Sequence, residues 1–310
     1  MAPRVVYLGN DAWSVPPLVA AAASPALELV LVMTRTPRPG RRGAGRSPTP
    51  VALTAREFDL PLAEVETVRA GDGLRRLREA DPDVLAIVAY GEILTPAVLD
   101  VPRAGAVNLH FSLLPRWRGA SPVQHALLAG DRETGVTTML LDEGLDTGPI
   151  LAQETTSVEV DDDAGRLGLR LSEIGGVLLA RTLTDLAAGR ATPTPQDDSS
   201  ATHARKLTAA DRRIDWHDAV PAVLARVRAF APQPGASTTR AGRVLKILAA
   251  SAAGGEGEPG TVTDVGDRWF DVAANGGVVR ILEVASEARS RMDAGSWLRG
   301  AHLRVGERFG

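Results

Sequence analysis

Asn108 and His110 are the two residues whose types and spacing are best suited to chemistry. They stand at the end of a short apolar stretch, residues 106–109, which reads as a buried strand. Side chains alternate along a strand, so Asn108 and His110 would point to one face while Leu109 points to the other. Asn donates to a carbonyl oxygen or an oxyanion at any pH, and His exchanges a proton near neutrality. The pair suits acyl transfer, although a polar strand end satisfied by its own loop is the plainer interpretation.

A second polar cluster, Asp-Glu-Gly-Leu-Asp-Thr-Gly at residues 142–148, follows a predicted strand at residues 136–141. We expect this cluster to emerge at the same edge of the sheet as His110. An acid there could orient His110 or relay a proton through water, and the glycines permit backbone conformations that a side chain forbids. The alternative is an acidic surface turn.

Other kinds of site find little support in the sequence. The chain has no Cys, which excludes disulfides, thiolate metal sites and a Cys nucleophile. The turn after the first predicted strand is not G-x-G-x-x-G, and the P-loop and G-x-S-x-G motifs are absent. No two histidines are spaced i, i+4 as metal ligands on a helix would be; they are His110, His125, His203, His217 and His302. We therefore expect no metal.

The elements that would position these residues alternate between strand and helix. Apolar runs predict strands at residues 4–8, 28–33, 84–89, 106–109 and 136–141, and Ala- or Leu-rich stretches predict helices at residues 15–23, 50–58, 72–80, 122–128 and 164–188. This alternation predicts an α/β fold with an open, mostly parallel, Rossmann-like sheet. In such sheets ligands bind at the carboxyl ends of the strands, where Asn108 and His110 would lie.

A second, smaller domain is predicted beyond residue 189. Residues 190–205 are polar and Pro-rich, which is typical of a linker with few apolar anchors. A helix at residues 218–230 then precedes short strands at residues 244–248, 260–265, 269–273 and 278–284, which favours a small β-barrel. Residues 249–260 read as an exposed loop. The predicted division is 1–189, 190–205 and 206–310.

Charge is nearly balanced over the whole chain but not locally. The net charge of -3, from 35 basic and 38 acidic residues, excludes a uniformly basic nucleic-acid coat protein. Residues 35–46 nevertheless hold five arginines and no acid. The first residues lack the apolar stretch of a signal peptide, and no apolar run approaches the roughly 20 residues that span a bilayer. We therefore expect a cytoplasmic protein with a local positive field.

The sequence resembles the folate-dependent formyltransferases over nearly its whole length. Residues 108–119 read Asn-Leu-His-x-Ser-Leu-Leu-Pro-x-x-Arg-Gly, and Asp-x-Gly-x-Asp-Thr-Gly follows at residues 142–148. Further matching stretches lie at residues 47–51, 88–91, 117–124, 130–137, 206–207, 213–216 and 228–232. Purine-pathway members of the family share the first motifs but lack the second domain. The resemblance implies the α/β sheet described above and a C-terminal OB-like barrel.

The resemblance also implies roles for individual residues. The catalytic trio would be Asn108, His110 and Asp146. A folate would contact Ser112, Leu113, Leu114, Pro115 and Asp142, with backbone bonds from Val88, Ala89, Tyr90 and Gly91. The implied reaction transfers a formyl group from 10-formyltetrahydrofolate to the α-amine of methionine on initiator tRNA, which serves translation initiation.

Two basic stretches of the sequence fit a tRNA as the partner. We expect the arginine-rich stretch to contact its phosphates, through Arg35, Arg38, Arg41, Arg42 and Arg46. Residues 205–246 add nine basic residues against three acids. No obligate protein partner and no membrane are expected.

Three positions depart from the family pattern. Position 111 is Phe where many relatives have a small residue or Pro, Asn10 stands where Thr is common, and Trp13 replaces a more usual Phe. Phe111 should point away from Asn108 and His110, so we expect it to alter packing rather than chemistry.

Two alternatives remain open at the level of sequence. A sugar-nucleotide formyltransferase would use the same donor, but a small acceptor needs no long cationic path. A catalytically inactive, folate-responsive RNA-binding protein would explain the basic stretches, but gives no reason for an intact Asn108, His110 and Asp146.

Overall fold

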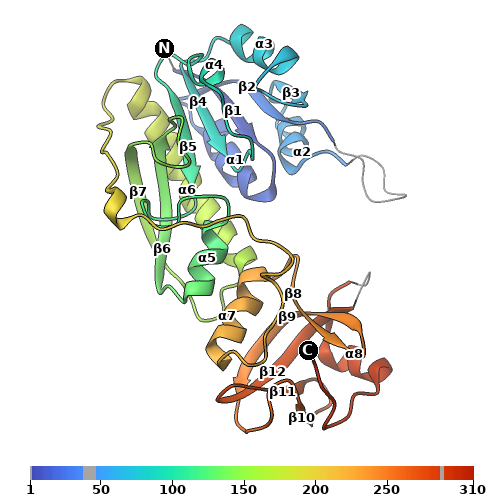
Figure 1. Cartoon of the computed structure of the whole chain (residues 1–310). Helices are drawn as coiled ribbons and strands as arrows, with labels where there is room; N and C mark the ends of the chain where they lie inside the picture. Colours follow the sequence, from blue (N-terminus) through green and yellow to red (C-terminus); the bar gives the residue numbers. More distant parts are fainter. Residues whose placement is uncertain (1, 38–46, 287–289) are drawn as a thin grey trace. The chain divides into compact units, whose positions relative to one another are not determined.

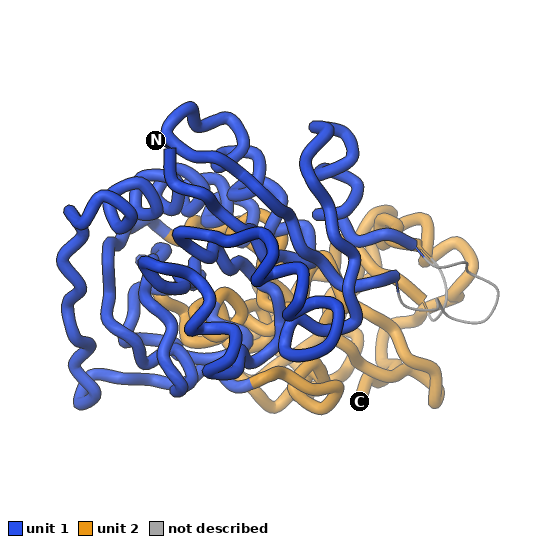
Figure 2. Tube along the Cα trace, turned by 90° about the horizontal axis from the view of Figure 1, so that it is seen from above, with its two compact units in different colours: residues 1–122, 133–157, 168–205 blue, residues 123–132, 158–167, 206–310 orange. Residues whose placement is uncertain are grey.

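The computed structural model of the chain describes residues 2–37, 47–286 and 290–310. It divides into two compact units, each considered by itself (Figure 2). The first unit comprises Met1–Pro122, Glu133–Ser157 and Gly168–Arg205, and the second comprises Val123–Arg132, Val158–Leu167 and Lys206–Gly310.

The first unit is built on a seven-stranded sheet in the order β3-β2-β1-β4-β5-β6-β7 (Figure 1). Its strands are β1 (Arg4–Gly9), β2 (Glu28–Arg35), β3 (Leu62–Val65), β4 (Val84–Val88), β5 (Ala106–His110), β6 (Glu133–Leu140) and β7 (Ile150–Ser157). Strands β3, β2, β1, β4 and β5 pair in parallel, whereas β6 and β7 pair antiparallel. The predicted open, mostly parallel α/β sheet is confirmed.

Helices cover the sheet of the first unit, and one of them packs against β5. They are α1 (Val15–Ala23), α2 (Pro50–Glu57), α3 (Gly71–Glu79), α4 (Pro96–Leu99) and most of α6 (Ala164–Ala187). Leu109 of β5 is buried against α6, where a Cβ on Gly175 would lie 2.7 Å from a Leu109 methyl carbon. Because Leu109 faces α6, its neighbours Asn108 and His110 face the other side.

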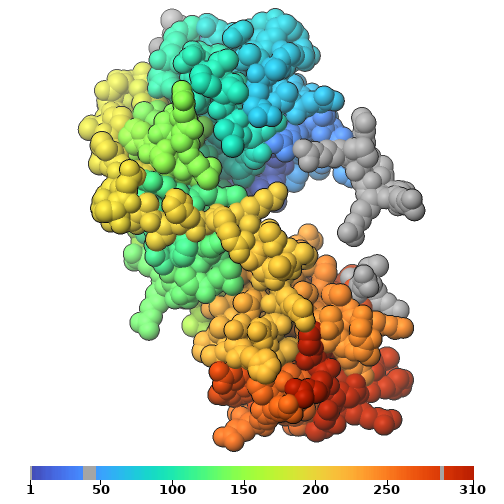
Figure 3. Space-filling model, in the orientation of Figure 1, coloured from blue at the N-terminus to red at the C-terminus, as the bar shows by residue number. Residues whose placement is uncertain are grey.

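Residues 190–205, which we call the connecting segment, run along the surface of the first unit (Figure 3). Most of its side chains are exposed, as expected. Its backbone, however, exchanges two hydrogen bonds of 2.8 Å between Thr194 and Ile150. Further along, the N–H of Arg118 donates to Thr202 O at 2.8 Å and that of Ala204 donates to Arg118 O at 2.7 Å. Apolar anchors are few, and backbone hydrogen bonds hold the segment instead.

The second unit contains a six-stranded antiparallel sheet with β10-β11-β12-β9-β8 in order and β13 paired to β12. Its strands are β8 (Ala236–Arg240), β9 (Arg243–Ala253), β10 (Val262–Val265), β11 (Phe270–Ala274), β12 (Gly277–Ser286) and β13 (Met292–Asp293), and its helices include α7 (Val220–Phe230) and α8 (Ala294–Ala301). The expected separate, smaller β domain is confirmed.

One predicted loop in this unit is a strand. Residues 249–260 were expected to be exposed loop, yet β9 continues to Ala253, which pairs with Val278 of β12. Alanine and glycine dominate that stretch and carry little β propensity. The long partner strand β12 supplies the hydrogen bonds that local propensity does not predict.

Candidate active site

Asn108 and His110 project from the same face of β5, close to its carboxyl end. Asn108 is half-buried, and His110 is only 5% exposed. Two residues apart in a strand, their side chains start roughly 7 Å from one another. An amide donor and a titratable ring therefore share one side of the sheet, as the sequence predicts.

Asp146 reaches His110 by a route that the sequence does not indicate. We expected residues 142–148 to emerge at the same sheet edge as His110, and this is wrong. Strand β6 runs antiparallel to β5, with Thr137 opposite His110 and Leu140 opposite Val107. The loop after β6 therefore starts beside the beginning of β5, and its return brings an Asp146 carboxylate oxygen within 3.6 Å of His110 Nδ1.

The hydrogen bond on the far side of the ring sets the tautomer of His110. Nε2 lies 2.9 Å from the carbonyl oxygen of Trp117. Because a carbonyl oxygen only accepts, Nε2 carries a hydrogen. In neutral His110 the lone pair of Nδ1 therefore faces the carboxylate of Asp146. His110 Nδ1 and the Asp146 carboxylate are then two facing acceptors, and a proton placed between them would form a hydrogen bond with both.

The backbone at Asp146 is held in an unfavourable conformation. Its φ is 55°, in the left-handed region that costs a non-glycine residue about 1–2 kcal/mol. The carboxylate accepts a hydrogen bond of 2.8 Å from the N–H of Gly119, and the carbonyl accepts one of 2.9 Å from Gln196. Two residues on, a Cβ at Gly148 would overlap the Leu140 carbonyl oxygen, so only glycine fits there. The loop is built to present one carboxylate.

Asp142, predicted to contact folate, lies exposed at the start of this loop. Its Oδ1 accepts hydrogen bonds from the Gly144 N–H at 2.9 Å and the Thr147 hydroxyl at 2.8 Å. These bonds close the loop on itself and leave the other carboxylate oxygen facing outward. A contact from that oxygen to a ligand stays a prediction.

The predicted folate segment at residues 112–115 packs inward. Ser112 is fully buried, and its hydroxyl donates to the Arg116 carbonyl at 2.6 Å. The N–H of Leu114 donates to the Thr137 hydroxyl at 3.1 Å, and the amide of Gln153 donates to Leu114 O at 3.0 Å. Leu113 and Pro115 are half-buried. The polar groups of this segment shape the turn, so a folate contact here would be apolar.

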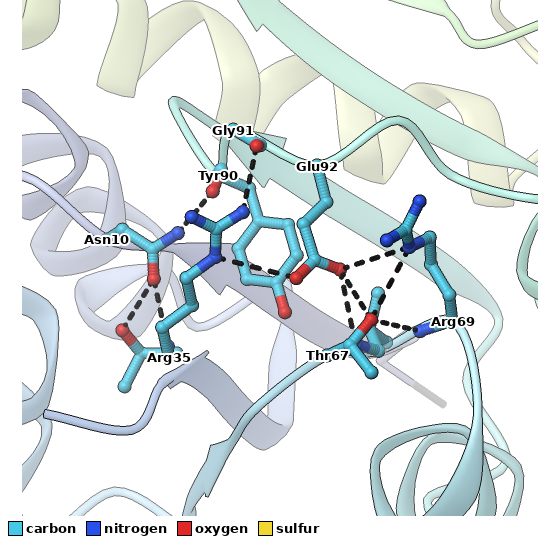
Figure 4. Close-up of polar contacts among 9 residues, drawn as sticks. Asn10, Arg35, Thr67, Arg69, Tyr90, Gly91 and Glu92 are labelled. Carbon is cyan, nitrogen blue, oxygen red and sulfur yellow. Dashed lines mark hydrogen bonds and ion pairs between the residues drawn. The ribbon is translucent and has the colours of Figure 1, made fainter. Parts of the chain in front are cut away.

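The second predicted folate segment, residues 88–91, follows β4 and is already bonded through three of its carbonyls. Val88 O accepts from the Ser14 hydroxyl at 2.7 Å. Tyr90 O accepts from the Asn10 amide, and Gly91 O accepts from Arg35 at 2.8 Å (Figure 4). Between Val88 and Tyr90, Ala89 has a φ of 42°. A carbonyl oxygen has two lone pairs, so Tyr90 O and Gly91 O, which lie beyond the end of β4, can each accept a second hydrogen bond.

Tyr90 contributes a free donor to the same place. The residue is 2% exposed, and its hydroxyl has no hydrogen-bond partner within the described part of the chain. Burial, and to a smaller extent the Glu92 carboxylate, raises the pKa of the Tyr90 phenol, which therefore stays protonated. A buried donor without a partner is a group that a ligand can satisfy.

Arg35 is the only predicted tRNA-contacting arginine among the described residues. Its guanidinium donates to Gly91 O, lies 3.5 Å from the buried Glu92 carboxylate, and sits over the Tyr90 ring (Figure 4). These contacts fasten Arg35 to the end of β4, which favours a positioning role over a phosphate contact. The predicted tRNA contacts Arg38, Arg41, Arg42 and Arg46 fall outside the described residues.

Sequence reasoning missed Arg118 and Gln196. The motif at residues 108–119 includes Arg118 without indicating its partners. Arg118 is 4% exposed and turned inward, with Nε donating to Gln196 Oε1 at 2.9 Å. Its other end donates to Asp198 at 2.7 Å. Gln196 lies in a polar, Pro-rich stretch without a spacing signal, so no local pattern could single it out.

Two of the three departures from the family pattern contact each other. The rings of Trp13 and Phe111 meet edge to face with centroids 5.8 Å apart. Trp13 is also tied to α6, since its carbonyl accepts a hydrogen bond of 2.6 Å from Ser172. Phe111 is buried, away from the face of Asn108 and His110. The third departure, Asn10, joins strand ends by accepting from the Thr34 hydroxyl at 3.0 Å and the Arg35 N–H at 2.9 Å.

Phe111→Ala should lower the free energy of unfolding by about 3–5 kcal/mol, because it removes a buried ring. In a double-mutant cycle with Trp13→Leu, which removes the second ring, we expect a coupling energy of about 0.5–1.5 kcal/mol from the edge-to-face pair. Denaturant titration of the four proteins measures both values. A coupling energy near zero would show that the two rings pack independently.

Within the described ranges, no group of three or more His, Asp or Glu side chains is arranged to hold a metal ion. Nor does any helix of those ranges combine the length and apolarity needed to cross a membrane.

Comparison with known proteins identifies the family. The model of the formyl transferase family matches residues 4–183, and that of the formyl transferase C-terminal domain matches residues 206–302. The methionyl-tRNA formyltransferase of Geotalea daltonii is 39% identical over 99% of this chain and 98% of its own length, and that of Halorhodospira halophila is 42% identical over 99% of both. The structure of HypX from Aquifex aeolicus with tetrahydrofolic acid shares the fold, with a TM-score of 0.68 at 21% identity; the match covers 99% of this chain and 49% of HypX. This chain belongs to the formyl transferase family and, within it, to the methionyl-tRNA formyltransferases.

Proposed function

We propose that this chain transfers a formyl group from 10-formyltetrahydrofolate to the α-amine of methionine on initiator tRNA. The observation that carries the proposal is the distance of 3.6 Å between His110 Nδ1 and the Asp146 carboxylate, beside the strand that also carries Asn108 two residues earlier. Full-length similarity to methionyl-tRNA formyltransferases at 36–42% identity supports the same acceptor. The reaction serves translation initiation, and we therefore propose that the protein acts in the cytoplasm.

The proposed reaction begins with attack of the methionine amine on the formyl carbon of the donor. A C–N bond forms, and the formyl oxygen becomes an oxyanion that the Asn108 amide stabilises by donating a hydrogen bond. The amine loses its proton to the two facing acceptors, His110 Nδ1 and the Asp146 carboxylate, which lie 3.6 Å apart. His110 is then positively charged and adds to the stabilisation of the oxyanion.

Collapse of the intermediate completes the transfer. The bond between the formyl carbon and N10 of the folate breaks, the oxyanion becomes a carbonyl again, and N10 takes up the proton held by His110 and Asp146. Asp146 stabilises the charged ring between the two steps and prevents the proton from escaping to water. The products are formylmethionyl-tRNA and tetrahydrofolate.

For the donor, we propose binding by two sets of residues. One set is Val88, Ala89, Tyr90 and Gly91, and the other is Ser112, Leu113, Leu114, Pro115 and Asp142. The unpartnered Tyr90 hydroxyl and the remaining lone pairs of the carbonyls after β4 support polar recognition of a heterocycle. The inward bonding of residues 112–115 supports apolar contact by the second set.

For the acceptor, we propose that residues 1–189 catalyse the reaction, that residues 206–310 bind tRNA, and that residues 190–205 join them. Arg38, Arg41, Arg42 and Arg46 would contact phosphates. The excess of basic residues at 205–246 supports a second cationic surface.

Incubation with labelled formyl donor and one of two acceptors tests the proposal. We expect label on charged initiator tRNA and none on dTDP-linked amino sugars. Label on the sugar nucleotide would identify the sugar-nucleotide alternative, and binding of folate and tRNA without transfer would identify the inactive RNA-binding alternative.

Replacing Arg41 and Arg42 together by Ala should weaken tRNA binding and reduce the slope of log K against log salt by up to about 1.8, if both contact phosphates. Donor affinity should not change. The matched control is Arg75→Ala with Arg76→Ala, which removes two exposed charges already paired within α3. Equal salt slopes for the two variants would show that residues 41 and 42 do not contact phosphate.

A further inference from the structure

We propose that Gln196 of the connecting segment is a positioning residue for Asp146. Its Nε2 donates to two backbone carbonyls of the catalytic loop, Asp146 O at 2.9 Å and Gly148 O at 2.7 Å. Both hydrogens of the amide are thereby used. The proposal deepens the proposed function and rests on it, since it concerns how the acid of that reaction is held.

The orientation of the Gln196 amide is fixed by its third partner. Oε1 accepts from Nε of Arg118 at 2.9 Å. A guanidinium only donates and a carbonyl only accepts, so the amide cannot turn over without losing all three bonds. Arg118 is itself held, because it is 4% exposed and its backbone bonds to Thr202 and Ala204.

Three hydrogen bonds and one peptide bond close these contacts into a ring of four residues: Asp146, Gln196, Arg118 and Gly119. Gly119 follows Arg118 in the chain, and its N–H donates to the Asp146 carboxylate at 2.8 Å. Arg118 thus fixes both ends of Asp146, the carbonyl through Gln196 and the carboxylate through the next peptide. Each member of the ring restrains the next.

Asp146 needs such restraint because of where it lies. Its φ of 55° is unfavourable, the neighbouring Leu145 is exposed, and the exposed Thr147 bonds to Asp142 of the same loop. An isolated loop of this kind would relax towards an ordinary backbone conformation and carry the carboxylate away from His110. Gln196 opposes that relaxation at the peptide of Asp146 itself.

Gln196→Ala should therefore slow single-turnover formyl transfer by about 10- to 100-fold, since a displacement near 1 Å at a reacting group costs up to about 10²-fold. Affinities for donor and tRNA should stay within about twofold of wild type. Gln196→Glu has the same size but turns a carboxylate towards two carbonyls, so it should be slower still. The control is Thr192→Ala, an exposed position of the same segment outside the ring.

The decisive readout is a double-mutant cycle with Asp146→Asn. If Gln196 acts through Asp146, adding Gln196→Ala to Asp146→Asn should cost less than about twofold, whereas a general structural role would slow both backgrounds alike. Equal slowing in both backgrounds, or a wild-type rate for Gln196→Ala, would overturn the proposal. Should Gln196→Ala melt below the assay temperature, Gln196→Glu is used in the same cycle.

The proposed function fails in a different way. If wild-type protein transfers no formyl group to charged initiator tRNA, the reaction itself is wrong. If wild type is active and the cycle shows no coupling, only the role of Gln196 is wrong.

Discussion

Asp146→Asn should slow single-turnover formyl transfer by roughly 10²–10⁴-fold, the range typical of positioned acid–base groups. Asparagine has nearly the volume of aspartate, and its Oδ1 can still accept from the Gly119 N–H that lies 2.8 Å from the carboxylate. What it loses is the negative charge facing His110 Nδ1 and the ability to take part in holding a proton. Rapid-mixing assays with formyl donor and charged initiator tRNA measure the rate.

The controls for this variant separate chemistry from folding. Thermal melting and donor binding should match wild type, because the loop keeps its hydrogen bonds. Glu143→Gln removes an exposed charge from the same loop and should retain the wild-type rate. A well-folded Asp146→Asn protein that transfers formyl at nearly the wild-type rate would remove Asp146 from the mechanism.

Asn108→Ala should reduce the same rate by about 10²–10³-fold, the cost of losing one donor to an oxyanion. His110→Ala removes the group that accepts the proton and becomes charged, and should cost a comparable factor. Backbone pairing with β4 and β6 holds β5, so neither replacement should change its path. Combined, the losses should fall short of their product, because residues that act on one intermediate are not additive.

The rate of the double variant shows whether Asn108 and His110 act on the same step or on separate steps. A double variant whose loss equals the product of the single losses would mean that Asn108 and His110 act on separate steps. Chemical rescue of His110→Ala by imidazole would further show that the ring, rather than its packing, is needed.

Much of the first sheet could be predicted from local pattern because its strands are continuous apolar runs. Residues 5–8 and 84–88 are buried on both faces, and both stretches consist of hydrophobic residues, which is the pattern that predicts a buried strand. Strands β3 and β7 were missed for the opposite reason. They form the two edges of the sheet. Strand β3 is only four residues long, and β7 contains the exposed residues Glu154 and Thr155, so neither is a continuous apolar run.

The candidate site was predicted only in part. Residue types identified Asn108 and His110, and the family motif added Asp146. The direction of β6 was not predictable, since a strand reads the same whether it pairs parallel or antiparallel. The ring through Gln196 and Arg118 joins residues 78 positions apart by polar contacts alone, and no periodicity reports such a contact.

The anchoring of the connecting segment bears on where this chain can be divided. A catalytic half cut at the end of α6, at Ala187, would keep all seven strands of the first sheet and all three residues of the trio. It would nevertheless lose the hydrogen bonds that Thr194 makes to Ile150, Gln196 to Asp146, and Thr202 to Arg118. Any attempt to study formyl chemistry on a shortened protein, or to exchange second domains between relatives, should place its junction after residue 205. Three of the sixteen residues before that junction, Thr194, Gln196 and Thr202, hold the segment to the first unit, and a shortened protein that keeps them keeps the support of the Asp146 loop.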